Sequence, residues 1–294
     1  MAPGPQVRLL ADGRRLHLQH GPIDLIVEGF GAGAEVAGAY GQAAARFATI
    51  LDELVAELAD LRRPFGGRRP GRYRSATARR MARAVAPHAD RFITPMAAVA
   101  GAVADEVLAA LLAGRTLERA YVNNGGDIAL HLGAGEHFTT GLVVPAERTT
   151  PLGTIRIDAA GAVRGIATSG RGGRSFSLGI ADSVTVLARD AAAADAAATV
   201  IGNAVDVDHP AIERKPARDL DPDSDLGDRP VTVSVGELDA ASVAAALDAG
   251  EAIARTMRDR RLIVGAALVL AGDVRLVGGD ISLSRSGPAL ATTA

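Results

Sequence analysis

Residues 183–204 read SVTVLARDAAAADAAATVIGNA and place a strand pattern directly before a helix pattern. The segment 183–188 is rich in β-branched and aliphatic residues, which predicts a strand. The alanine-rich segment 191–204 predicts a helix, because alanine has the highest helix propensity of all residues. The fold is therefore expected to combine strands with helices rather than to be all-α or all-β.

The same alternation of helices and strands continues outward along the chain. Further helices are expected at 35–61, 77–85, 97–112 and 240–258. Further strands are expected at 24–28, 121–122, 128–131, 139–144, 154–157, 163–167, 231–235, 262–270 and 274–277. Because no linker divides these elements, we expect an α+β fold with α/β-type alternation. It would form a single large domain, residues 1–294, of mixed sheets covered by helices.

The segment 206–230 differs from the rest of the chain. It reads DVDHPAIERKPARDLDPDSDLGDRP, with four prolines and a dense mixture of charges. Such a composition buries little apolar area. We therefore expect a mobile surface loop here.

Composition excludes several classes of function. The net charge is −2 and aromatic residues make up 3% of the chain, which argues against nucleic acid and anionic membranes as partners. Cysteine is absent, so disulfides and thiolate metal sites are excluded. The first residues, MAPGPQVRLLADGRRL, lack the apolar run of a signal peptide, and the longest apolar stretch, 262–271, is short for a membrane helix. We expect a cytoplasmic protein.

Residues Asn123, Asn124, Gly125, Gly126 and Asp127 form the first motif that could carry chemistry. Paired glycines let the backbone turn tightly and approach a ligand, and the Asn and Asp side chains supply polar contacts. The alternative is a plain hairpin turn, for which Asn-Gly and Gly-Asp are usual residues. The motif alone favours the turn.

A second motif combines hydroxyls, glycines and arginines after an expected strand. Such a combination suits an anionic or phosphate-bearing ligand, and a plain loop is the alternative. The residues are Thr168, Ser169, Gly170, Arg171 and Arg174.

The third motif is Asp195 and Thr199 in the alanine-rich helix. Their i, i+4 spacing places both side chains on one face of the helix. A carboxylate and a hydroxyl one turn apart form an oxygen pair that suits Mg²⁺. The alternative is that Asp195 binds no ion. Its charge would then only interact favourably with the positive end of the helix dipole, or its side chain would be exposed to solvent.

The order of these motifs resembles the ApbE superfamily, which contains the Mg²⁺-dependent FAD:protein FMN transferases. The resemblance rests on TPMAAVAGAVAD (94–105), VNNGGDIAL (122–130), TSG (168–170) and SVTVLARDAAAADAAAT (183–199). The wording SGRGGRSFSLGIADSVTV and the later IGNAV are similar to an uncharacterised branch of that superfamily.

The resemblance implies a ligand set. Its metal pattern falls on Asp195, Thr199 and the carbonyl of Ala97, with Mg²⁺ as the expected ion. Its GGD turn faces the nucleotide and corresponds to 125–127. FAD or a related nucleotide is therefore the expected ligand. Assembly of the chain with further copies of itself, as a homo-oligomer, stays open.

Two departures from the transferases bear on the reaction. A Lys-Gly pair of the transferases is replaced here by Ala100-Gly101, and their His-containing stretch before the SVTV strand reads SFSLGI at 175–180. A positive charge for the pyrophosphate and an acid/base group are thus missing. Two hypotheses stay open: a Mg²⁺-dependent enzyme acting on a flavin or nucleotide pyrophosphate, though not a standard FMN transferase, and a non-catalytic binder.

Overall fold

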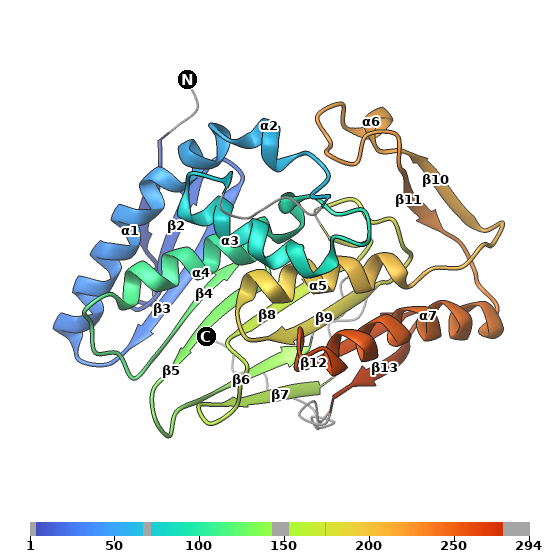
Figure 1. Cartoon of the computed structure of the whole chain (residues 1–294). Coiled ribbons are helices and arrows are strands. Elements are labelled where there is room, and N and C mark those ends of the chain that lie inside the picture. The colour runs from blue at the N-terminus through green and yellow to red at the C-terminus, as the bar shows by residue number, and fades with distance from the viewer. Residues whose placement is uncertain (1–3, 67–71, 143–152, 174, 279–294) are drawn as a thin grey trace.

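A nine-stranded sheet forms the centre of the computed structural model, which describes residues 4–66, 72–142, 153–173 and 175–278. The strand order is β1-β2-β3-β4-β5-β8-β9-β12-β13, and every neighbouring pair in it is antiparallel (Figure 1). The strands of this sheet are β1 (Gln6–Leu9), β2 (Leu16–His20), β3 (Ile23–Phe30), β4 (Arg119–Asn124), β5 (Asp127–Leu132), β8 (Gly165–Ser169), β9 (Ser183–Ala188), β12 (Gly265–Leu270) and β13 (Asp273–Val277).

One face of this sheet is covered by helices, and we call it the helix face (Figure 1). The helices are α1 (Gly33–Val55), α2 (Leu58–Leu61), α3 (Ala76–Val85), α4 (Val99–Leu112), α5 (Ala191–Ala204) and α7 (Ala240–Asp259). Two short 3₁₀ turns lie between α3 and α4. The turn η2 (Ala86–His88) directly follows α3, and η3 (Pro95–Ala98) directly precedes α4. The expected helix over 35–61 divides at residues 56–57, where the Glu57 carboxylate accepts the backbone N–H groups of Arg74 and Ser75.

The opposite face of the sheet, which we call the second face, has a smaller apolar core. A two-stranded sheet of β6 (His137–Leu142) and β7 (Gly153–Asp158) packs there through Ile155 and Ile157 against Leu130 and Leu187. The expected α+β class is confirmed, with antiparallel pairing in each described sheet.

Alternation along each strand decides which face a side chain takes, because successive residues point to opposite sides. In β3, Leu25 and Val27 are buried against the helices, which places Asp24 and Ile26 on the second face. All six residues of β9 are buried, since both of its faces are covered. This explains why its sequence is apolar throughout rather than alternating.

The segment 206–230 contains regular structure rather than a plain loop. It includes β10 (Ile212–Pro216) and α6 (Ala217–Leu220), and β10 pairs with β11 (Pro230–Val235). The hairpin projects from the body beyond the end of α5 (Figure 1). Its tip returns to the body, where the hydroxyl of Thr94 donates to the carboxylate of Asp225. The expected mobility of this segment stays a prediction.

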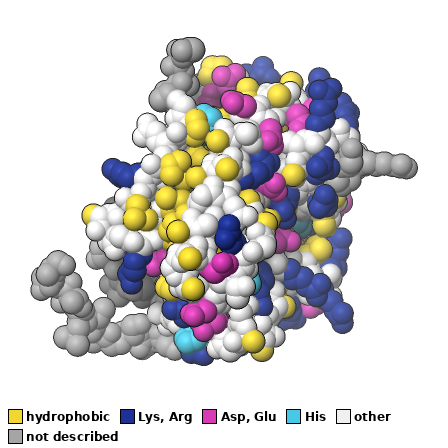
Figure 2. Space-filling view, turned by 90° about the vertical axis from the view of Figure 1, so that its left-hand side faces the viewer, with side chains coloured by type: hydrophobic (Ala, Val, Ile, Leu, Met, Phe, Trp, Pro, Cys, Tyr) yellow, Lys and Arg dark blue, Asp and Glu magenta, His cyan; other side chains and the backbone are white. Residues whose placement is uncertain are grey.

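The end of the molecule that carries β1 is shown in Figure 2, where hydrophobic side chains form a band beside a region rich in Lys and Arg. On β1 itself, Val7 and Leu9 are about half exposed, at 52% and 50%. One stretch of the described residues, Pro95–Leu112, is long and apolar enough to cross a bilayer, but 56% of it is buried inside the fold. This burial is what a core helix shows.

Candidate functional site

Asp195 lies on α5 and contacts the N-terminus of α4, which is distant in sequence. The Oδ2 of its carboxylate accepts the backbone N–H of Gly101 at 3.0 Å, and the N–H of Ala100 donates to the same carboxylate. Both N–H groups belong to the first turn of α4, where helix N–H groups lack partners within the helix. Asp195 therefore caps the N-terminus of a neighbouring helix.

A second carboxylate makes the reciprocal contact. Asp105 of α4 accepts the N–H groups of Ala191 and Ala192, the first residues of α5, at 3.0 and 2.9 Å. The N-termini of α4 and α5 thus lie against each other, and each helix carries the carboxylate that caps the other. Their approach depends on Gly101, because a Cβ added there would lie 2.2 Å from the carbonyl oxygen of Ala191.

The electrostatics of this junction are unusual for carboxylates. Burial first, and the nearby charge of Asp127 second, raise the pKa of Asp195 well above its usual value, while the N–H bonds from Gly101 and Ala100 oppose the rise. Burial, followed by the charge of Asp190, raises the pKa of Asp105 from 3.8 to about 6. Burial therefore disfavours the charged form of both carboxylates, and a nearby positive charge would favour it.

The donor set around Asp195 is compatible with Mg²⁺. A carboxylate has about four lone-pair positions, so two N–H bonds leave positions for a cation. Thr199 lies one turn further along α5, as expected, and Ala97 lies in η3, which packs against α5. Within the described part of the chain, no group of three His, Asp or Glu side chains is arranged around a common point. Metal binding by these residues stays a prediction.

Residues 123–127 form the expected hairpin turn and also reach the junction. Asn124 pairs with Asp127, and Gly125 and Gly126 have φ angles of 64° and 113°, which favour glycine. The Oδ1 of Asn123 accepts the N–H of Gly126 at 2.9 Å and closes the turn. The turn interpretation is therefore correct.

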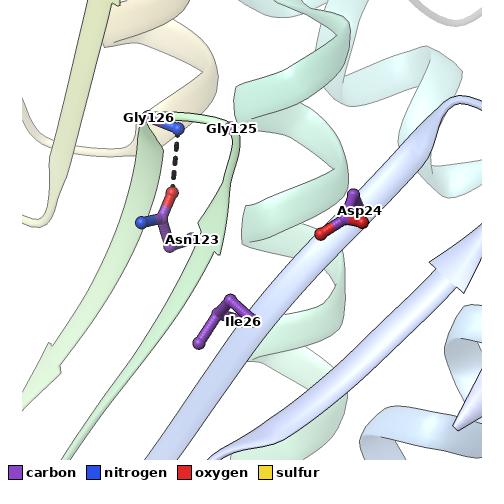
Figure 3. A pocket seen from close by; sticks show the side chains of 5 residues that line it. All are labelled: Asp24, Ile26, Asn123, Gly125 and Gly126. Carbon is purple, nitrogen blue, oxygen red and sulfur yellow. Dashed lines mark hydrogen bonds between the residues drawn. The ribbon is translucent and has the colours of Figure 1, made fainter.

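Neighbouring asparagines of this turn serve opposite faces of the sheet. On the helix face, the Nδ2 of Asn124 donates to the carbonyl oxygen of Ala100 at 3.1 Å, in the same turn of α4 that Asp195 caps. On the second face, Asn123 lines a cavity of about 380 Å³ with Asp24, Ile26 and the two glycines (Figure 3). The turn is thus the border between the carboxylate junction and this cavity.

The side chains of the second motif also lie on opposite faces of the sheet. Thr168 lies on the second face, where its hydroxyl is 2.9 Å from that of Thr185, whereas Ser169 faces Gly202 of α5. The guanidinium of Arg171 binds the carboxylate of Asp182 at 2.7 and 3.0 Å.

The charge of Arg171 is therefore already compensated, which weakens it as a phosphate partner. Gly170 allows a close backbone approach, since a Cβ there would lie 2.4 Å from the carbonyl oxygen of Asp182. Arg174 lies outside the described residues.

Two contributors to the site are not among the residues expected from the sequence. Asp105 has one signal, since it and Glu106 are the two carboxylates in the mostly apolar helix VAGAVADEVLAALL. Asp24 has none, because a polar residue in an alternating strand is usually only solvent-facing. In the structure the Asp24 carboxylate lines the cavity and lies 3.1 Å from the Nε2 of His17.

The sequence of this chain matches a family model and several curated proteins. A family model described as AbpE bacteria matches residues 7–276. A UPF0280 protein of Methanothrix thermoacetophila is 40% identical over 117 residues, which are 40% of this chain and 48% of the relative. A UPF0280 protein of Methanopyrus kandleri is 41% identical over 135 residues, 45% of this chain and 51% of the relative. The chain thus matches about half the length of these curated relatives.

Two solved structures are similar in overall arrangement. The flavin transferase ApbE from Vibrio cholerae has a TM-score of 0.42 at 12% identity, and the match covers 94% of this chain and 98% of that one. The apo flavinyl transferase ApbE of Pseudomonas stutzeri has a TM-score of 0.40 at 14% identity, with 93% and 94% covered.

Proposed function

This chain belongs to the AbpE bacteria family, and we propose that it is a cytoplasmic, Mg²⁺-dependent enzyme that acts on the pyrophosphate of a flavin or nucleotide. The observation that carries the proposal is the position of Asp195, which lies one helix turn from Thr199 and within electrostatic reach of the buried Asp127. Two carboxylates that are near each other disfavour ionisation of both, and a cation between or beside them would relieve this.

The proposed metal ligands are Asp195, Thr199 and the carbonyl oxygen of Ala97, with water or ligand oxygens completing the coordination. When bound, Mg²⁺ would polarise a phosphoryl oxygen and offset the charge that develops on it. The chain's own residues keep this arrangement rigid. Asn124 ties the glycine turn to the first turn of α4, and Asp105 ties α4 to α5.

The glycine turn supports a ligand that extends past the junction. A Cβ placed on Gly126 would have no heavy atom within 4 Å, so the space outside this residue is open. Without side chains at 125 and 126, a flavin or nucleotide could lie close to the backbone.

Transfer of FMN to a protein hydroxyl is not part of the proposal. Ala100 stands where the transferases carry Lys, and its carbonyl is occupied by Asn124. The stretch before β9 that contains a His in the transferases reads SFSLGI here, at 175–180, and Arg171 is paired with Asp182. Since a general base is typically worth ~10²–10⁴ in rate, we propose hydrolysis or transfer between small molecules instead.

A non-catalytic flavin or nucleotide binder is the second candidate. The capping role of Asp195 favours this candidate, because capping of α4 explains the position of the carboxylate without a metal. Both candidates predict a ligand at the glycine turn, but only the enzyme requires a divalent ion for it.

Titration calorimetry of the wild type with ADP and with FAD, each with and without Mg²⁺, tests the proposal. We expect Mg²⁺ to strengthen binding of both ligands, and Asp195→Asn to remove this dependence. The matched control is Asp52→Asn, which removes an exposed carboxylate of α1. Ligand binding that is tight and indifferent to Mg²⁺ in all three proteins would favour the non-catalytic binder. Release of AMP from FAD, followed by chromatography, would establish catalysis.

A further inference from the structure

Another cavity lies between α3, with the turn η2 that follows it, and the start of α5. Its volume is about 160 Å³, below the roughly 300–1,000 Å³ that is common for drug-sized ligands, so it suits a small ion. We call it the arginine cavity, and its polar lining residues are Arg80, Arg83, His88 and Asp190. None of them contacts Asp195 or belongs to the glycine turn.

Two arginines on one face of α3 supply donors to the arginine cavity, because their i, i+3 spacing makes them neighbours. Arg83 is exposed, and its guanidinium has neither an ion pair nor a hydrogen bond with the described residues. Arg80 donates to Glu106 at 3.4 Å, but Glu106 also binds Arg46 at 3.0 Å. The Nε of Arg80 is buried and, within the described part of the chain, has no acceptor. A buried donor without an acceptor is costly, so a ligand oxygen within its reach would be favourable.

Two further groups strengthen the preference for an anion. The Nη2 of Arg260 donates to the carbonyl oxygen of Pro87, a lining residue, at 3.4 Å, which brings a third guanidinium near the cavity. Burial first, and the charge of Arg260 second, lower the pKa of His88 to about 4. The ring is therefore neutral near pH 7 and has one N–H donor. Guanidinium groups and N–H donors together are what a phosphate or sulfate oxygen binds best.

Asp190 restricts which anion fits. One carboxylate oxygen of Asp190 accepts the N–H of Ala193 at 2.7 Å, which leaves the other oxygen as an acceptor. A fully deprotonated anion such as sulfate is repelled by this carboxylate and has no hydrogen to donate to it. Inorganic phosphate near neutral pH keeps at least one O–H group. It can donate that hydrogen to a carboxylate while its other oxygens accept from arginines.

We propose that the arginine cavity is a binding site for inorganic phosphate in a protonated form. The oxygens without hydrogen accept from the guanidinium groups of Arg80 and Arg83, and the O–H group donates to Asp190. This site is separate from the proposed flavin or nucleotide site, since it requires no divalent ion and shares no residue with the metal ligands.

Titration calorimetry near pH 7, with divalent ions removed by EDTA, compares inorganic phosphate with sulfate and methyl phosphate. Sulfate has no O–H group, and methyl phosphate has mostly lost its own, because the second pKa of a phosphate monoester is about 6. We expect wild type to bind phosphate about tenfold or more tightly than either probe. Arg83→Gln should weaken phosphate binding about tenfold, the value of one hydrogen bond to a charged group. The matched control is Arg8→Gln, which removes an exposed arginine of β1 outside the cavity.

Asp190→Asn tests the recognition of the proton. The amide keeps an oxygen for the N–H of Ala193 and replaces the other acceptor by an N–H donor. The preference for phosphate over sulfate should therefore vanish or reverse in this variant. Asp195→Asn should leave phosphate binding unchanged, which separates the arginine cavity from the proposed metal site.

Four outcomes would overturn the inference. The first is that wild type does not bind phosphate at millimolar concentrations, and the second is that Arg83→Gln binds it as tightly as wild type. Equal binding of phosphate and sulfate by wild type would refute the role of Asp190. Loss of phosphate binding in Asp195→Asn would place the anion at the carboxylate junction instead. Because Arg83 is exposed, its variant should fold, and far-ultraviolet circular dichroism checks this.

Discussion

Replacing Asp105 by Asn tests the reciprocal caps on α4 and α5. Asp105 is 8% exposed, and its carboxylate accepts two N–H groups of the first turn of α5. An amide of the same size keeps one acceptor oxygen, so one buried N–H group loses its partner. The expected cost is about 1–3 kcal/mol in the free energy of unfolding.

Ionisation of Asp105 has the opposite effect on the difference in stability between wild type and variant, and this effect depends on pH. Its pKa is raised from 3.8 to about 6, mainly by burial, so the folded protein binds a proton that the unfolded chain has released. The contribution to stability is fully present below about pH 4 and is lost as pH rises through 6, a change of about 3 kcal/mol. Asparagine cannot ionise, so Asp105→Asn lacks this loss.

The two stability curves are therefore expected to converge or cross. Near pH 4 the variant is less stable than wild type by the hydrogen-bond term, and near pH 7 it is equally stable or more stable. Urea unfolding followed by circular dichroism between these pH values measures both curves, with Asp52→Asn as the control. A difference between wild type and Asp105→Asn that stays constant across the range would refute the raised pKa. A difference near zero throughout would refute the cap as well.

Two further predictions concern other buried groups. Gly101→Ala should destabilise the protein by about 1–3 kcal/mol or more, because the new Cβ meets the carbonyl of Ala191 at 2.2 Å. Gly41→Ala, in α1 with nothing within 4 Å, should stabilise it by about 0.5–1 kcal/mol, and thermal unfolding of the two variants should show opposite signs. His88 is buried, and this burial, with the charge of Arg260 second, lowers its pKa from 6.5 to about 4. Its contribution to stability is lost as pH falls from 6.5 to 4, and an NMR titration that placed its ring near 6.5 would contradict this.

Local sequence patterns predicted the elements whose burial is continuous. The bounds of β9 and α5 match the expected ranges 183–188 and 191–204, since an apolar strand and an alanine-rich helix each carry a strong local signal. Strand β1 was missed because all four of its residues are exposed and it shows no alternation. Strand β10 was missed because it lies in a charged segment and depends on pairing with β11.

The site was predictable where one element carries the pattern and not where two elements meet. The i, i+4 relation of Asp195 and Thr199 is local to α5, so the sequence shows it. The role of Asp105 depends on Ala191, 86 residues later, and on the close approach at Gly101. The expected strand at 121–122 ended too early to show that residues 123 and 124 point to opposite faces.

The cap and the proposed metal site compete for the same carboxylate, and this determines which residue matters most for cation binding. The N-terminus of α4 carries a partial positive charge and already donates two N–H groups to Asp195, so by itself it disfavours a cation there. Thr199 and a backbone carbonyl are neutral and cannot reverse that. Burial first, and the nearby charge of Asp127 second, raise the pKa of Asp195 despite the helix, and Asp127 is the neighbouring carboxylate that can add negative charge at this place. The affinity for a divalent ion should therefore depend on Asp127 at least as strongly as on Thr199, even though Asp127 lies outside the metal-ligand pattern of α5.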